Sequence, residues 1–157
     1  MKAASVNELK EELKQLPAGK LVELCLRLAK YKKENKELLN YLLLESGNEQ
    51  GYISEVKNEI AEEFGTVNSS NLYFAKKTIR KILRIANKHI RYIGTKQAEA
   101  ELLIYFCAVL KNSGIPYEKS TALNNLFLAQ IKKASKAIDT MHEDLQYDLK
   151  KELNKLI

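Results

Sequence analysis

Apolar residues recur every three to four positions along most of this 157-residue chain, and no useful stretch alternates between apolar and polar with a period of two. This recurrence is typical of helices that bury one face, whereas a period of two would indicate strands. All six glycines and both prolines are expected to fall between the periodic segments. The pattern predicts helical segments after Ser5, over residues 20–46, 52–64, 72–93 and 95–113, and through a long C-terminal stretch.

Residues 102–110, Leu-Leu-Ile-Tyr-Phe-Cys-Ala-Val-Leu, are apolar on every side. A helix without a polar face must be surrounded, so a helix over about residues 95–113 is expected at the centre. The predicted fold class is all-α, an irregular bundle of seven to eight helices around this central helix. A chain of this length buries roughly two-thirds of its unfolded surface, so residues 1–157 are expected to form a single all-helical domain.

The sequence leaves two helix boundaries open. The segment over residues 20–46 has no apolar face between Tyr31 and Lys36, which favours a break near residues 32–35 over one long helix. Residues 120–157 form either one bent helix or two helices that meet near Thr140.

Three helix starts are predicted from capping residues. Ser5-x-x-Glu8 and Thr140-x-x-Glu143 both fit the capping box, in which side chains bond the free N–H groups of a first helical turn. Thr95 is expected to be the N-cap of the central helix.

The positive charge of the chain is concentrated in one segment. The formal net charge is +6, yet no Asp or Glu occurs between Phe64 and Ala98. At 100° per residue, the apolar side chains of residues 72–93, Phe74 among them, fall on one half of a helix. The other half holds Tyr73 and a cationic face about 140° wide and about 22 Å long. Its members are Lys76, Lys77, Arg80, Lys81, Arg84, Lys88 and Arg91.

Three interpretations of this cationic face stay open. In the first, it is a solvated surface that the preceding helix partly neutralises, since that helix carries carboxylates on one face. Exposed ion pairs stabilise by only about 0–1 kcal/mol each, so they would not explain so complete a segregation of charge. The carboxylates in question are Glu55, Glu59, Glu62 and Glu63.

In the second interpretation, the cations contact the phosphates of a nucleic acid, with binding mostly independent of base sequence. In the third, the partner is an acidic protein surface, which includes another copy of this chain. Binding to a membrane surface is not expected, because the apolar half is rich in Ile, as a core is, and the chain has no Trp.

No constellation of catalytic residues is recognisable. His89 lies on the apolar half of the basic helix, where a structural histidine is favoured over a catalytic one. His142 with Asp139 shares a helix face, but two ligands do not make a metal site, and a role at a helix start is favoured. The chain has no phosphate-binding loop, zinc-protease motif or nucleophile elbow. We therefore expect no enzyme activity, no catalytic residues, no metal, no cofactor and no small-molecule substrate.

The two cysteines, Cys25 and Cys107, occupy apolar helical positions without a CxxC spacing. They are interpreted as reduced core residues. The chain shows no signal peptide at its start, and its longest apolar run of nine residues is too short to span a bilayer. A cytoplasmic protein is expected.

Three features together resemble a family of small, uncharacterised bacterial all-helical proteins of unknown function. They are Leu9-Lys-x-Glu-Leu-x-x-Leu followed by Leu21-x-x-Leu, the basic stretch over residues 75–84, and residues 102–110 leading into a long C-terminal helix. The resemblance covers most of the chain. It implies an all-α fold and no particular activity.

The leading hypothesis from the sequence is a non-enzymatic interaction protein that binds an acidic partner surface through the basic amphipathic helix. The alternative is a nucleic-acid-binding protein that contacts the phosphate backbone with the same helix.

Overall fold

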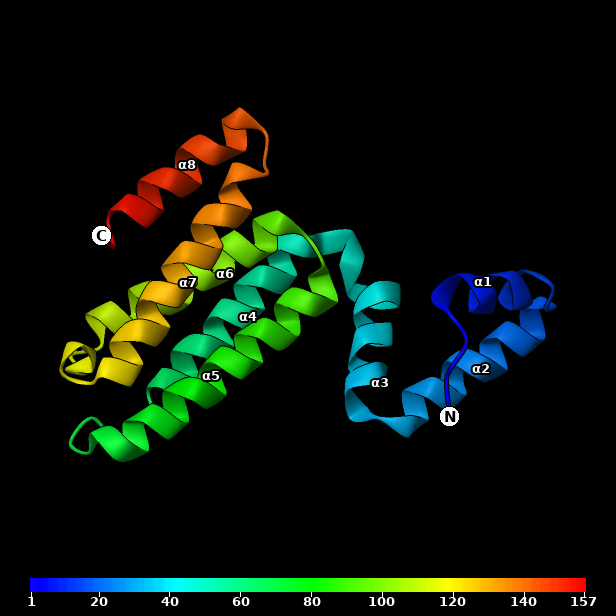
Figure 1. The fold of residues 1–157 in the computed structure, drawn as a ribbon, viewed down its shortest axis with the longest axis horizontal. Coiled ribbons are helices and arrows are strands. Elements are labelled where there is room, and N and C mark those ends of the chain that lie inside the picture. The colour runs from blue at the N-terminus through cyan, green and yellow to red at the C-terminus, as the bar shows by residue number, and fades with distance from the viewer. The chain divides into compact units, whose positions relative to one another are not determined.

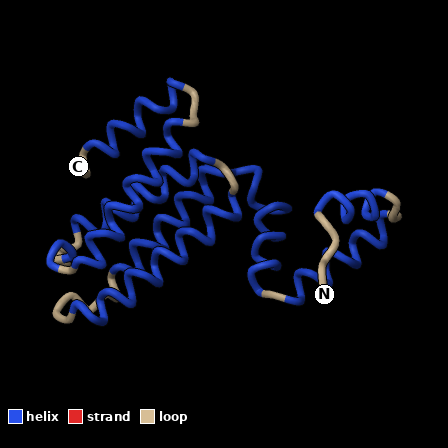
Figure 2. The backbone as a smooth tube through the Cα atoms, viewed as in Figure 1, coloured by secondary structure: helices blue, strands red, loops and turns tan.

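A computed structural model describes all 157 residues and contains only helices and their connections, with no strand (Figure 2). The predicted all-α class is confirmed. None of the helices is both long and apolar enough to cross a lipid bilayer. In chain order the helices are α1 (Val6–Lys14), α2 (Ala18–Tyr31), α3 (Lys33–Asn40), a π-helical turn (Tyr41–Glu45), a 3-10 turn (Ser46–Asn48), α4 (Glu49–Phe64), α5 (Leu72–Ile93), α6 (Lys96–Asn112), a 3-10 turn (Tyr117–Lys119), α7 (Thr121–Asp139) and α8 (Glu143–Asn154).

The contacts between residues divide the chain into two compact units, Met1–Leu44 and Glu45–Ile157. The first unit contains α1, α2 and α3, and the second contains α4 to α8. That residues 1–157 fold as a single domain stays a prediction.

In the first unit, α3 packs against α2. The predicted break near residues 32–35 is confirmed, because α2 ends at Tyr31 and α3 begins at Lys33. The Asn35 side chain donates a hydrogen bond to the Leu28 carbonyl at 2.8 Å, which satisfies a carbonyl that the end of α2 leaves free. Tyr41 is the only buried residue of the unit.

In the second unit, α6 is the central element, as the sequence predicts. It contacts α4, α5, α7 and α8, and its apolar residues are buried on more than one side. Phe106 is fully buried, with its ring centroid 5.5 Å from that of Phe64 in α4. Thr95 caps α6 by accepting a hydrogen bond from the Ala98 N–H at 3.2 Å, which confirms the predicted helix start.

The helices α4 and α5 lie side by side and run in opposite directions (Figure 1). The helix α4 begins at Glu49, earlier than the predicted residue 52, because the Asn48 side chain caps it by accepting from the Gly51 N–H at 3.1 Å. Two glycines thus lie inside first helical turns, Gly19 in α2 and Gly51 in α4, and the prediction that all glycines fall between helices is wrong. A Cβ atom at Gly51 would collide with the Asn48 amide that forms the cap.

The C-terminal stretch forms two helices, and this settles the boundary that the sequence leaves open. Thr140 is the C-cap of α7 and donates to the Ala137 carbonyl at 2.7 Å. His142 is the N-cap of α8, and its ring accepts from the Asp144 N–H at 3.3 Å. The predicted capping box at Thr140 is therefore wrong. The helix start predicted at Ser5 is confirmed, because Ser5 is the N-cap of α1 and its side chain accepts from the Glu8 N–H at 3.2 Å.

The two cysteines are both free but differ in environment. Cys107 in α6 is fully buried, and burial raises the pKa of its thiol to about 12. Cys25 in α2 is exposed, so its assignment to the core is wrong. Its helix does have the apolar face that the sequence indicates, but that face carries no buried residue.

Replacement of Phe106 by Ala tests the enclosure of α6. Phe106→Ala is expected to lower the free energy of unfolding by about 3–5 kcal/mol, because it removes a buried ring and leaves a cavity. Phe74→Ala is the matched control, since Phe74 in α5 is half-exposed and its removal should cost less than about 1 kcal/mol. Urea denaturation followed by circular dichroism measures both. Equal losses for the two variants would contradict a central, enclosed α6.

Candidate functional site: the cationic face of α5

The ends of α5 are fixed by its flanking residues. The Asn71 side chain accepts hydrogen bonds from the Tyr73 and Phe74 N–H groups at 3.0 and 3.3 Å. At the other end, Gly94 takes the left-handed conformation at φ 75° and donates its N–H to the Ile90 carbonyl at 2.8 Å. These caps hold a straight run of six turns over 22 residues.

One face of α5 is buried in the interior of the second unit. Its residues recur at spacings of three and four and have no exposed surface, and the helix contacts both α4 and α6. They are Ala75, Ile79, Ile82 and Ala86. The rotation of α5 about its axis is thereby fixed, and the opposite face is turned to solvent.

The solvent side holds the cationic face predicted from the sequence. Lys77, Arg80, Lys81, Arg84 and Arg91 are exposed, and Lys76 and Lys88 are half-buried. The predicted placement of the seven cations on one side of a helix is thus what the structure shows. Whether these cations are free to bind a partner depends on how many of them the carboxylates of α4 neutralise.

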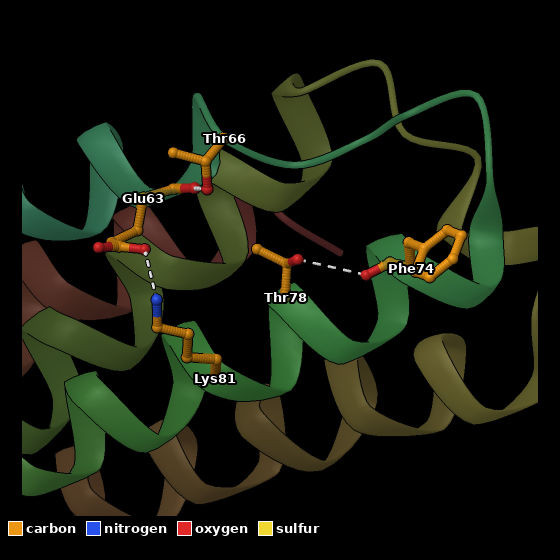
Figure 3. A network of polar contacts seen from close by, with 5 residues as sticks. All are labelled: Glu63, Thr66, Phe74, Thr78 and Lys81. Carbon is orange, nitrogen blue, oxygen red and sulfur yellow. Dashed lines mark hydrogen bonds and ion pairs between the residues drawn. The ribbon is translucent and has the colours of Figure 1, made fainter.

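The acidic face of α4 lies beside α5 but neutralises little of its charge. Glu63 in the last turn of α4 forms an ion pair with Lys81, with 3.4 Å between Oε2 and Nζ (Figure 3). The Glu63 carbonyl accepts from the Thr66 hydroxyl at 2.7 Å, which holds the end of α4 next to this pair. Glu55 and Glu62 are exposed and form no ion pair. An exposed pair such as Lys81 with Glu63 contributes about 0–1 kcal/mol.

Several cations of the face have no carboxylate partner in the chain. No ion pair joins Lys76, Arg80, Arg84 or Arg91 to an Asp or Glu. Lys77 instead lies over the Tyr73 ring, with its Nζ 4.9 Å from the ring centroid. The ion pair with α4 lies at Lys81, in the middle of the face, and it leaves Arg80, Arg84 and Arg91 without a carboxylate.

Two aromatic side chains extend the face at the start of α5. Tyr73 and Phe74 are 62% and 52% exposed, and their ring centroids are 5.5 Å apart at an interplanar angle of 75°. Phe74 was expected in the packed half, and that prediction is wrong. It lies at the edge of the apolar arc and in the first turn, next to Thr78, whose hydroxyl donates to the Phe74 carbonyl at 3.2 Å (Figure 3).

His89 joins α5 to α4 through both of its ring nitrogens. Nδ1 lies 2.7 Å from the Tyr52 hydroxyl, and Nε2 lies 3.0 Å from a carboxylate oxygen of Glu59. The Glu59 carboxylate accepts from Nε2, whereas the Tyr52 hydroxyl can either donate to Nδ1 or accept from it. The His89 side chain is only 12% exposed. Its two partners are seven residues apart in α4, and this spacing, which puts both on one helix face, is the signal that could have identified them.

His142 has the role at a helix start that its sequence context favours. As the N-cap of α8, its Nδ1 is also 3.5 Å from an Asp144 carboxylate oxygen, and both side chains are exposed. Asp139 is the last residue of the preceding helix. No group of three or more His, Cys, Asp or Glu side chains in the chain is arranged to hold a metal ion.

Comparison of the chain with protein-family models, curated proteins and solved structures gives no match. The resemblance to small bacterial all-helical proteins of unknown function stays a prediction.

A double-mutant cycle tests the link through His89. His89→Ala is expected to lower the free energy of unfolding by about 2–3 kcal/mol, because it removes a mostly buried ring and its hydrogen bonds to Tyr52 and Glu59. Tyr52→Phe should cost about 0.5–1.5 kcal/mol. The double variant should lose about 0.5–1 kcal/mol less than the sum, as expected for residues in one network. Additive losses in urea denaturation would show that the hydrogen bond does not hold α4 to α5.

Proposed function

We propose that this protein is a cytoplasmic, non-enzymatic interaction protein that binds an acidic protein surface through the cationic face of α5. The observation that carries the proposal is the group of exposed arginines, Arg80, Arg84 and Arg91, that have no carboxylate partner within the chain. Unneutralised charge of one sign on a rigid element attracts partners of the opposite sign and speeds their association.

The Lys81–Glu63 pair supports carboxylate as the partner group. At this point a carboxylate from a neighbouring helix already lies on the cationic face, at 3.4 Å. A partner helix or loop that carries Asp or Glu could continue this arrangement along α5 toward Arg84 and Arg91. Arginine suits such a partner, because its planar guanidinium bonds a carboxylate through two parallel N–H groups.

A non-enzymatic role is proposed because the histidine nearest to the face is already engaged in packing. Both ring nitrogens of His89 bond to side chains of α4, and its ring also lies edge-on to that of Tyr92 at 5.8 Å. The cytoplasmic location is supported by the two free thiols, which are typical of a reducing compartment.

Nucleic acid is a second candidate partner, and the exposed pair of Tyr73 and Phe74 favours it. Aromatic rings at one end of a cationic stripe offer bases a surface on which to stack, while the cations contact the phosphates. Stacking contributes about 1–3 kcal/mol per base. The same rings could equally pack against an apolar part of an acidic protein.

Two probes distinguish these partners, a fluorescent polyglutamate peptide and a fluorescent single-stranded oligonucleotide, each titrated with the full-length protein at several salt concentrations. We expect binding of the peptide at about 50 mM salt, and a loss of at least about tenfold in affinity for Arg80→Gln/Arg84→Gln. Lys132→Gln/Lys133→Gln is the matched control, because it removes two exposed, unpaired cations from α7. It should bind as the wild type does.

Tight binding of the oligonucleotide instead of the peptide would replace the first proposal with the second. In that case Arg80→Gln/Arg84→Gln should reduce the slope of log affinity against log salt by about 1.4, and Phe74→Ala should weaken binding further. An equal loss in the Lys132→Gln/Lys133→Gln control would refute a specific role for α5 with either probe.

A further inference from the structure

The first unit has almost no interior of its own. Its helices α1, α2 and α3 contain no buried residue, and 12 of the 18 large hydrophobic side chains that are exposed in the whole chain lie within its 44 residues. Units of about this size usually need an additional source of stability, such as association with another chain. We therefore expect a binding partner to cover this exposed apolar surface in the functional state of the protein.

The apolar side chains line a groove of about 790 Å³ between α1 and α2. Five of them are 40% to 77% exposed. The apolar lining consists of Leu9, Leu13 and Leu16 from α1, and Leu24, Leu28 and Tyr31 from α2. Since both helices contribute, the groove is built by the α1–α2 pair and not by one helix alone.

The charges that line the groove are separated by sign. Glu12 lies on the α1 side, and Arg27 and Lys30 lie on the α2 side. None of these three forms an ion pair within the chain. Neighbouring charges away from the groove do form pairs, Lys14 with Glu11 at 3.5 Å and Lys20 with Glu23 at 3.3 Å. The groove thus has one acidic edge and one basic edge, and both are available.

We propose that a second copy of this chain covers the groove, related to the first by a two-fold axis. In such an interface a residue i of one copy contacts residue j of the other, and j contacts i. Glu12 of each copy then faces Arg27 and Lys30 of the other, and the leucines of the two grooves are buried between them. A partner of a single charge would satisfy only one edge of the groove.

The area of the groove fits a weak dimer. At roughly 60–120 Å² for a fully exposed leucine-sized side chain, the five side chains, which are about half exposed, offer roughly 150–300 Å² of apolar surface. Only about 57% of a typical interface is apolar, so two copies would bury up to about 1,000 Å² in total. This is at the lower limit for specific interfaces, and we expect a dissociation constant in the micromolar range. The dimer does not depend on the proposed function of α5.

Sedimentation equilibrium of the full-length protein from about 1 μM to about 200 μM tests the proposal directly. The apparent mass should rise with concentration from 18.0 kDa toward twice that value. A constant mass of one chain throughout would overturn the proposal, because a groove that two copies cover must bring them together within this concentration range.

A charge exchange tests the two-fold arrangement. Glu12→Lys makes both edges of the groove basic, and Arg27→Glu/Lys30→Glu makes both acidic, so each variant alone should dimerise at least about tenfold more weakly. An equimolar mixture should recover a dimer, because each edge again meets its opposite. If both variants keep their helix content by circular dichroism and the mixture stays monomeric, the arrangement is wrong.

Two controls keep the result specific. Glu11→Lys has the same charge change in the same helix but lies outside the groove lining, so it should leave the dissociation constant within about twofold of the wild type. Arg80→Gln/Arg84→Gln should also leave dimerisation unchanged. A loss of the dimer in this last variant would overturn the proposal and place self-association on α5. Because the wild-type concentration series needs no variant, the proposal can be refuted even if a substitution unfolds the first unit.

Discussion

The enclosure of α6 is the constraint on which the second unit depends. Residues 102–110 of α6 are apolar on all sides, so several other helices must approach them, and only Tyr105, Ala108 and Val109 among them stay half-buried. α4, α5, α7 and α8 meet this need, and each can do so with one apolar face. The buried ring of Phe106 and the buried thiol of Cys107 lie on this central helix. Each outer helix is oriented so that its apolar face packs against α6.

This constraint explains why α5 displays its cations. Once Ala75, Ile79 and Ile82 are buried, the seven cations can lie only on the outer side of the helix. The binding proposed for α5 would lose little conformational entropy, because the buried face already fixes the position of the helix. The first unit differs, because its helices have apolar faces but no central apolar helix like α6 packs against them.

Periodicity and charge made the helices, the central position of α6 and the cationic face predictable. They are local signals, carried by residues a few positions apart, and caps such as Gly94 mark their ends. What the sequence could not provide is which surface covers a given apolar face. Cys25 therefore has the pattern of a core residue and is exposed, and Phe74, at the edge of its arc, is half-exposed. The partners of His89 lie 37 and 30 residues away in the chain, and only the pairing of α4 with α5 brings them together.

The rate at which the two thiols react with a thiol reagent tests the enclosure of α6 most directly. Cys25 is exposed, whereas Cys107 is buried with a pKa raised to about 12, so it can react only when the bundle opens. We expect one thiol per chain to react at once in the native protein, and a second to react slowly and to speed up with added urea. Raising the pH from about 7 to about 9 should not bring the second thiol into the fast phase, because it stays protonated below its pKa. Two thiols that react equally fast without denaturant would contradict a bundle built around α6.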